Sequence, residues 1–160
     1  MDKNTQLIKE LFRKQFPLLA GDNNFEISSP ETPDYNCLAW ALHFDNRWMQ
    51  PPSITLPPMD SVYYWPEGAL QGTSIDCLVD AYRKKGFVIC DNPDFEKEYQ
   101  KIALYFHPEN GDWTHAARQL RNGFWTSKMG SSHDIQHSTP FVLEGDYYGK
   151  VYCIMRRPFN

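Results

Sequence analysis

The sequence contains no long apolar run, which excludes a protein anchored by a membrane-spanning helix. Such a helix needs about 18 consecutive apolar residues, and no run of that length occurs among the 160 residues. The first residues, MDKNTQLIKELFRKQF, also lack the uninterrupted apolar segment and the small-residue cleavage site of a secretory signal peptide. We therefore expect a cytoplasmic protein, with export by a specialised secretion system as the alternative.

The sequence also lacks the usual marks of metal, cofactor and nucleic-acid binding. The four cysteines, at positions 37, 77, 90 and 153, form no CxxC pair, and without a signal peptide we expect them to be reduced thiols. The 16 basic and 20 acidic residues are mixed along the chain, whereas a nucleic-acid-binding domain usually carries a basic stripe. We expect no metal, no cofactor, no nucleic-acid partner and no membrane partner, and the oligomeric state is left open.

Aliphatic residues are scarce, and aromatic residues take their place. Ile, Leu and Val contribute 25 residues, while Phe, Trp and Tyr contribute 24. Each buried ring removes about 150–250 Å² from water, so rings can fill the core that the aliphatic residues leave incomplete. The composition predicts a single aromatic-rich domain over residues 1–160.

Predicted helices occupy the first half of the chain and predicted strands the second. Apolar periodicity and capping patterns predict helices over 4–16, 36–44 and 73–85, with a proline- and aromatic-rich segment at 45–72. Strands are expected at 24–28, 87–90, 101–107, 113–120, 124–129 and 150–156, with a polar loop at 130–140. This segregation predicts an α+β fold, with N-terminal helices packed on an antiparallel β-meander.

Cys37 is the cysteine best placed for chemistry. It falls in the first turn of the helix expected at 36–44, where the helix dipole and unpaired N–H groups favour a thiolate and can hold an oxyanion. Asn36 and the Cys37 N–H are the candidate oxyanion donors, with Tyr35 beside them. The alternative is a packed cysteine next to Leu38 and Trp40.

His115 is the best candidate for the base that a thiol nucleophile requires. It lies early in a predicted strand and is followed by two small residues, which leave room for another group to approach the imidazole. Asp134 or His137 could orient it as the third member of a triad, and the alternative is an ordinary half-buried histidine. Two further polar residues could line the site, Gln119 and Ser127.

Four motifs together resemble a set of uncharacterised bacterial domains. They are YNCLAWA at 35–41, THAARQ at 114–119, WTSKMG at 125–130 and DIxH at 134–137. The likeness covers residues 31–157, which we take as the core, and leaves residues 1–17 as an N-terminal helix. More coarsely, the order of cysteine-bearing helix and histidine-bearing meander is similar to papain-like thiol hydrolases of the NlpC/P60 and CHAP type.

The resemblance implies a papain-like fold and thiol-dependent acyl transfer on the amide of a peptide or protein. Cys37 would be the nucleophile and His115 the base in a peptidase, amidase or deamidase. Aromatic residues would line the substrate site, namely Trp40, Trp65, Trp113 and Trp125. The alternative is a non-catalytic binding module on the same fold, associated with a toxin or effector, in which the segment from Trp48 to Trp65 is the binding surface.

Overall fold

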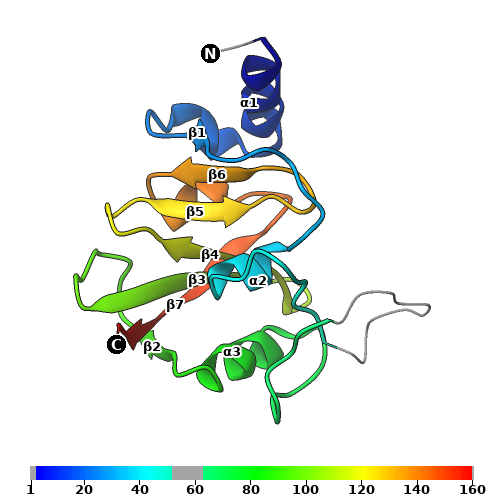
Figure 1. The fold of residues 1–160 in the computed structure, drawn as a ribbon, viewed down its shortest axis with the longest axis vertical. Coiled ribbons are helices and arrows are strands. Elements are labelled where there is room, and N and C mark those ends of the chain that lie inside the picture. The colour runs from blue at the N-terminus through cyan, green and yellow to red at the C-terminus, as the bar shows by residue number, and fades with distance from the viewer. Residues whose placement is uncertain (1–2, 52–62, 160) are drawn as a thin grey trace.

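The computed structural model describes residues 3–51 and 63–159. These residues form one β-sheet with other segments of the chain packed on both of its faces (Figure 1). The seven strands lie in the order β1-β6-β5-β4-β3-β7-β2, and all neighbours are antiparallel. In chain order they are β1 (Glu26–Ile27), β2 (Val88–Cys90), β3 (Tyr99–His107), β4 (Asp112–Gln119), β5 (Trp125–Lys128), β6 (Asp134–His137) and β7 (Lys150–Pro158). The expected α+β class with an antiparallel sheet is confirmed.

Two helices cover one face of the sheet, which we call the α2 face. These are α2 (Cys37–Ala41), which lies in front of the sheet in Figure 1, and α3 (Ile75–Arg83), which is drawn below it. Their buried side chains, such as Leu38 and Leu78, form one core with Ile102 and Leu104 of β3. This core brings the YNCLAWA motif onto the sheet.

The opposite face, which we call the α1 face, is covered by the N-terminal segment and one later turn. The segment contains α1 (Lys3–Gln15) and the 3-10 helix η1 (Pro17–Gly21), and the later turn is η3 (Pro140–Leu143). Rings dominate this second core, as the composition predicts. The fully buried ones include Phe16, Phe25, Tyr105 and Trp125.

Strand alternation decides on which face each motif residue lies. Successive side chains of a strand point to opposite faces, and in β4 Ala116 packs in the α2-face core while Ala117 packs in the α1-face core. His115 therefore shares the α1 face with Ala117, and its ring packs against Tyr105 and Tyr148. Cys37, by contrast, packs with the core of the α2 face.

The elements match the sequence expectations with three differences. The loop expected at 130–140 contains β6, because pairing with β5 and β1 makes a strand of a segment too short and polar to be recognised alone. The last strand, β7, lies between β3 and β2 rather than at the end of a meander. Helix α2 ends at Ala41, and His43 follows with a left-handed φ of 68°.

Two further expectations concern the loop at 45–72 and membrane segments. Residues 52–62 of the predicted proline-rich segment lie outside the described residues. Within the described part of the chain, no helix has the length and apolar character needed to cross a membrane.

Candidate functional site

Cys37 is the first residue of α2, as expected, and it is partly exposed to solvent. The Asn36 side chain caps the helix by accepting the Ala39 N–H at 3.2 Å. Burial raises the pKa of the Cys37 thiol to about 11, although hydrogen bonding from backbone groups of Ala116 and Leu38 acts in the opposite direction. Desolvation thus outweighs these hydrogen bonds and favours the protonated thiol over the thiolate.

This environment predicts slow alkylation of Cys37. Because only the thiolate reacts, a thiol with a pKa of about 11 should label at neutral pH about a hundredfold more slowly than an unperturbed cysteine. Labelling with iodoacetamide across a pH series, followed by peptide mass spectrometry, measures this, with Cys77 of the same chain as an internal comparison. Rapid labelling of Cys37 with a midpoint below about 8.5 would instead restore the nucleophile hypothesis.

His115 and Cys37 are kept apart by the sheet itself. Cys37 packs on the α2 face, whereas the His115 ring stacks on Tyr148 at 4.0 Å and an interplanar angle of 5° on the α1 face. Within the described residues, no hydrogen bond joins the thiol to an imidazole. The structure thus does not bring the proposed nucleophile and base together, because residues 115 and 116 of one strand point in opposite directions.

Ser127 joins His115 to His137 in a buried chain of hydrogen bonds. Its Oγ lies 2.9 Å from Nε2 of both imidazoles, and Nδ1 of His137 lies 2.9 Å from the Thr139 carbonyl oxygen. Burial lowers the pKa of His137 to about 4, and that of His115 falls well below its usual 6.5 through burial and then the nearby His137. Both rings are therefore neutral near pH 7.

Neutral rings permit a single direction for this chain of hydrogen bonds. Since a carbonyl only accepts, Nδ1 of His137 carries its proton, and its Nε2 must accept from the Ser127 hydroxyl. Ser127 then accepts from Nε2–H of His115, which leaves Nδ1 of His115 as a bare acceptor, and that atom has no hydrogen-bond partner among the described residues. The arrangement resembles an activated serine, but all three side chains have no solvent exposure.

Asp134 belongs to a different polar cluster, on the α2 face. Its Oδ2 accepts the Tyr35 hydroxyl at 2.6 Å, while its Oδ1 has no hydrogen-bond partner among the described residues. Lys128 is buried beside this pair, donates to the Thr32 and Ser132 carbonyls, and lies 5.0 Å from the Tyr35 ring centroid. Asp134 therefore anchors Tyr35, and only His137 of the two proposed orienting residues is linked to His115.

Of the four tryptophans expected to line a substrate site, Trp40, Trp65 and Trp113 pack against the α2-face core that Cys37 also contacts. Trp125 is 1% exposed in the α1-face core, and the Trp113 indole donates to the Gly72 carbonyl oxygen at 3.0 Å. Trp40 stacks on Tyr35 and donates to Thr126 Oγ1 at 3.1 Å. Trp65 donates to the Leu70 carbonyl oxygen at 3.1 Å and lines a cleft described below.

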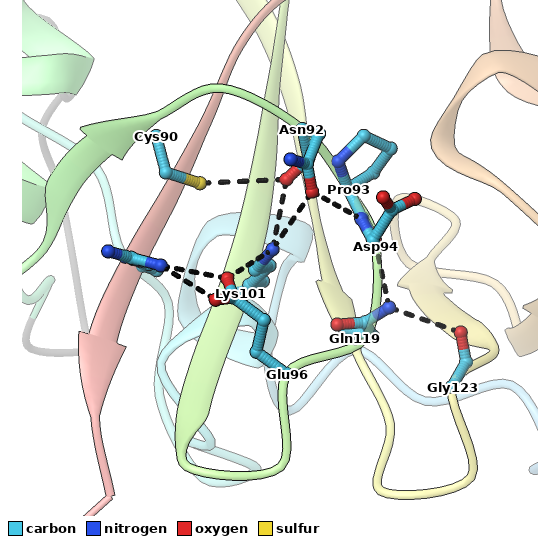
Figure 2. A network of polar contacts seen from close by, with 9 residues as sticks. Cys90, Asn92, Pro93, Asp94, Glu96, Lys101, Gln119 and Gly123 are labelled. Carbon is cyan, nitrogen blue, oxygen red and sulfur yellow. Dashed lines mark hydrogen bonds and ion pairs between the residues drawn. The ribbon is translucent and has the colours of Figure 1, made fainter.

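Gln119 takes part in the network that holds the loop at 91–98 on the sheet (Figure 2). Its Nε2 donates to the Pro93 and Gly123 carbonyl oxygens at 3.0 and 3.2 Å. In the same network, the almost fully buried Lys101 ammonium lies 2.7 Å from Glu96 Oε2. Gln119 therefore acts as a structural link in this fold, on the opposite face of the sheet from Cys37.

Asn36 connects α2 to the proline- and aromatic-rich segment. Besides capping the helix, its Oδ1 accepts the Met49 N–H at 3.0 Å, and its Nδ2 donates to the Met49 carbonyl oxygen at 2.8 Å. Backbone hydrogen bonds then join this stretch to the chain beyond the undescribed residues, from Tyr64 N to Trp48 O at 2.8 Å and from Gln50 N to Tyr64 O at 3.0 Å. The Asn36 side chain thus both caps α2 and holds Met49 of this segment through two hydrogen bonds.

The segment forms a cleft that we call the aromatic cleft, with a volume of about 580 Å³. Arg47 lies over the Phe44 and Tyr64 rings, at 4.8 and 5.6 Å from their centroids. The Trp48 indole donates to the Pro33 carbonyl oxygen at 2.6 Å, which closes the cleft against the chain before α2. The lining residues are Pro33, Asp34, Asn46, Arg47, Trp48, Tyr63, Tyr64 and Trp65.

Sequence reasoning singled out the segment of this cleft but missed Arg47 and Asp34. A cluster of Trp, Tyr and Pro was the available signal, and it marked the rings without showing which charged residues lie beside them.

As for metals, no group of three or more His, Cys, Asp or Glu side chains within the described residues is arranged to hold an ion. The residues that line the aromatic cleft are exposed or half-buried, whereas the side chains of His115, Ser127 and His137 are fully buried.

Comparison with known proteins places the chain in a family. The family described as a domain of unknown function (DUF7689) matches residues 26–156. The chain belongs to this family. The matched region contains α2, α3, the first six strands and β7 up to residue 156, but not α1 or η1.

One curated protein and no solved structure match the chain significantly. The phenylalanine–tRNA ligase alpha subunit of Deinococcus radiodurans is 31% identical over 111 residues, which cover 62% of this chain and 30% of the ligase subunit. The chain thus matches less than a third of that relative's length. No solved structure matches.

Proposed function

We propose that this domain is a non-catalytic binding module that holds an extended peptide segment of a partner protein in its aromatic cleft. The observation that carries the proposal is the composition of the cleft, which combines Trp48, Tyr63, Tyr64 and Trp65 with Arg47. Trp, Tyr and Arg are the residues that dominate binding energy at protein interfaces, and a volume of about 580 Å³ falls within the range of ligand sites.

The cleft suits a peptide in an extended or polyproline conformation. Both tryptophan indoles already donate to backbone carbonyl oxygens of the chain itself, so they contribute ring surface rather than hydrogen bonds. Aromatic grooves of this kind bind proline-rich segments, whose stiff conformation loses little entropy on binding. Arg47 and Asp34 are exposed and of opposite charge, and they can fix the direction of the peptide.

The thiol-hydrolase function and its papain-like NlpC/P60 fold remain predictions. They would require Cys37 to ionise against its raised pKa and to obtain a base other than the imidazole on the far face of the sheet. The match to part of a tRNA ligase subunit is compatible with a binding module, since such a module can be one segment of a longer protein.

Peptide binding can be measured on an immobilised array of short peptides rich in proline and aromatic residues, followed by tryptophan fluorescence titration of the hits. We expect micromolar binding, weakened about tenfold or more by Tyr63→Ala and by Arg47→Ala, because each removes a contact worth about 1.4 kcal/mol. Arg121→Ala is the matched control, since Arg121 is exposed and stacks on Phe159 away from the cleft.

Two results would contradict the proposal. One is an array with no binding peptide, and the other is binding that neither Tyr63→Ala nor Arg47→Ala weakens. Circular dichroism and thermal melting of both variants separate loss of binding from loss of folding. Tyr63 is half-buried and Arg47 exposed, so neither substitution opens a cavity in a closed core.

A further inference from the structure

Four cationic side chains gather on the α2 face beside the aromatic cleft. We call them the basic cluster: Arg47, Lys85, Arg118 and Arg157. None of the four forms an ion pair with a carboxylate of the described residues, whereas Lys101 and Arg156 both pair with Glu96. Positive charge that the fold itself does not neutralise is available to an anionic ligand.

The sheet brings Arg118 and Arg157 to the same end of the α2 face. They follow Ala116 of β4 and Met155 of β7 by two residues, and both of these pack in the α2-face core, so the arginines point to that face. Both strands are antiparallel to β3 and end beside its first residues. Burial, and then the charges of Arg118 and Arg157, lower the pKa of His43 to about 4, so both guanidinium groups lie near this imidazole.

The Tyr64 ring joins the basic cluster to the aromatic cleft. Cζ of Arg47 and Nζ of Lys85 each lie 5.6 Å from the centroid of that ring. A guanidinium N–H of Arg157 donates to the Lys85 carbonyl oxygen at 2.8 Å. Because Arg47 and Tyr64 also line the cleft, the cluster continues the cleft surface towards the end of the sheet.

Arg118 is held in place while most of its hydrogen-bond donors are unused. Its Cζ lies 4.3 Å from the Trp40 ring centroid, and one guanidinium N–H donates to Nδ1 of His43 at 2.7 Å. His43 is exposed and has a left-handed φ of 68°, which is uncommon outside glycine. A guanidinium has five N–H donors, and this is the one side-chain hydrogen bond that Arg118 makes among the described residues.

The acidic residues near the basic cluster do not neutralise it. Asp134, the carboxylate that acts on the charge of Arg118, already accepts the Tyr35 hydroxyl at 2.6 Å. Asp34 lines the cleft and Asp45 follows α2, but neither forms an ion pair with a cation in the part of the chain that the structure describes. The chain has a net charge of -4, so the excess of positive charge here is local.

We propose that the basic cluster binds acidic side chains of the peptide that occupies the aromatic cleft. This inference rests on the proposed function and adds the chemistry that selects the partner, an acidic segment next to a proline- or aromatic-rich one. An arginine held by stacking presents paired N–H donors that match a carboxylate. A nucleic acid is less well matched, since it needs a basic groove that follows its backbone, and Asp34 lies in the cleft.

Fluorescence anisotropy with three labelled peptides tests the inference. Each peptide contains the same stretch of tyrosine and proline, followed by a tail of glutamates, glutamines or lysines. We expect the glutamate tail to bind about tenfold more tightly than the glutamine tail at about 50 mM salt, and the lysine tail most weakly. The ratio of the two dissociation constants should approach one near about 500 mM salt, because exposed charges are then screened.

Substitutions in the cluster should remove this preference. Lys85→Gln and Arg118→Gln should each reduce the ratio to about threefold or less, and the double variant should reduce it to about one. Neither residue lines the cleft. The matched control is Lys14→Gln, which removes the same charge from an exposed position of α1 on the other face of the sheet, and it should keep the tenfold ratio. Because both peptides are measured on one preparation, a partly unfolded variant does not change the ratio.

The possible outcomes separate this inference from the proposed function. Equal affinity for the glutamate and glutamine tails overturns the inference and leaves the cleft function standing. A preference for glutamate that Lys85→Gln and Arg118→Gln do not reduce, or that Lys14→Gln reduces as much, also overturns it. Tight binding of the glutamate tail that Tyr63→Ala does not weaken supports the basic cluster and contradicts the cleft function. Binding of none of the peptides contradicts both, and tighter binding of a single-stranded oligouridylate would assign the cluster to nucleic acid instead.

Discussion

Acidification to pH 4 is expected to destabilise the fold by about 3 kcal/mol through His137 alone, with His115 adding to the loss. Burial lowers the pKa of His137 from 6.5 to about 4 in the folded chain. The unfolded chain therefore binds more protons in this range, so stability is present above pH 6.5 and is lost as the pH falls towards 4.

The groups around the two imidazoles define the pH window. His115 is packed against Tyr105, Tyr148 and Ser127, none of which titrates in this range. His137 also lies near Asp22. Burial alone would raise the pKa of Asp22, but hydrogen bonds from Ser138 and Asn24 outweigh it and leave that pKa below 3.8. Protonation of Asp22 therefore costs stability only at a lower pH than the histidines do.

Urea unfolding at a series of pH values measures this dependence. His137→Gln should reduce the slope of unfolding free energy against pH by about one proton, since glutamine can donate to Thr139 and accept from Ser127 without titrating. His133→Gln is the control, because His133 is half-exposed and outside the chain of hydrogen bonds through Ser127. A stability that stays level between pH 6.5 and 4 would show that the buried rings are charged in the folded protein.

Gly149→Ala should destabilise the fold by roughly 3 kcal/mol or more. Gly149 has a φ of 73°, and a Cβ there would lie 2.1 Å from the Phe106 carbonyl oxygen, a backbone atom that no side-chain rotation can move. The backbone of Gly149 also pairs with Gly145 in a short loop that contains Tyr148. The substitution should thus displace the ring that stacks on His115.

Gly130→Ala is the matched control for this prediction. Gly130 has a similar φ of 63°, but a Cβ there would meet no atom within 4 Å. It should therefore cost only the backbone strain of a left-handed alanine, about 1 kcal/mol. Thermal and urea unfolding compare the two variants. Equal losses would mean that close approach to Phe106 is not what the glycine at 149 provides.

Local structure could be predicted well from the sequence. Apolar periodicity predicted a helix over 4–16, where α1 forms, and strands over 113–120 and 124–129, where β4 and β5 pair across a tight turn in which Gly123 has a φ of 90°. Cys37 was expected in the first turn of a helix over 36–44, and it begins α2 with Asn36 as the capping residue. Each of these features depends on neighbours within a few residues, which is why sequence patterns reveal them.

Only the tertiary structure decided which motif residues meet. In a strand exposed on one face, alternation of polar and apolar residues shows which side is inward. In β4, however, His115, Ala116 and Ala117 are all 0–1% exposed, because layers cover both faces. Nothing local could then show that His115 faces α1 and joins Ser127 and His137, while Cys37 and Asp134 face α2. Composition and periodicity determined the elements and the aromatic core, and the packing of two layers on one sheet separated the expected catalytic pair.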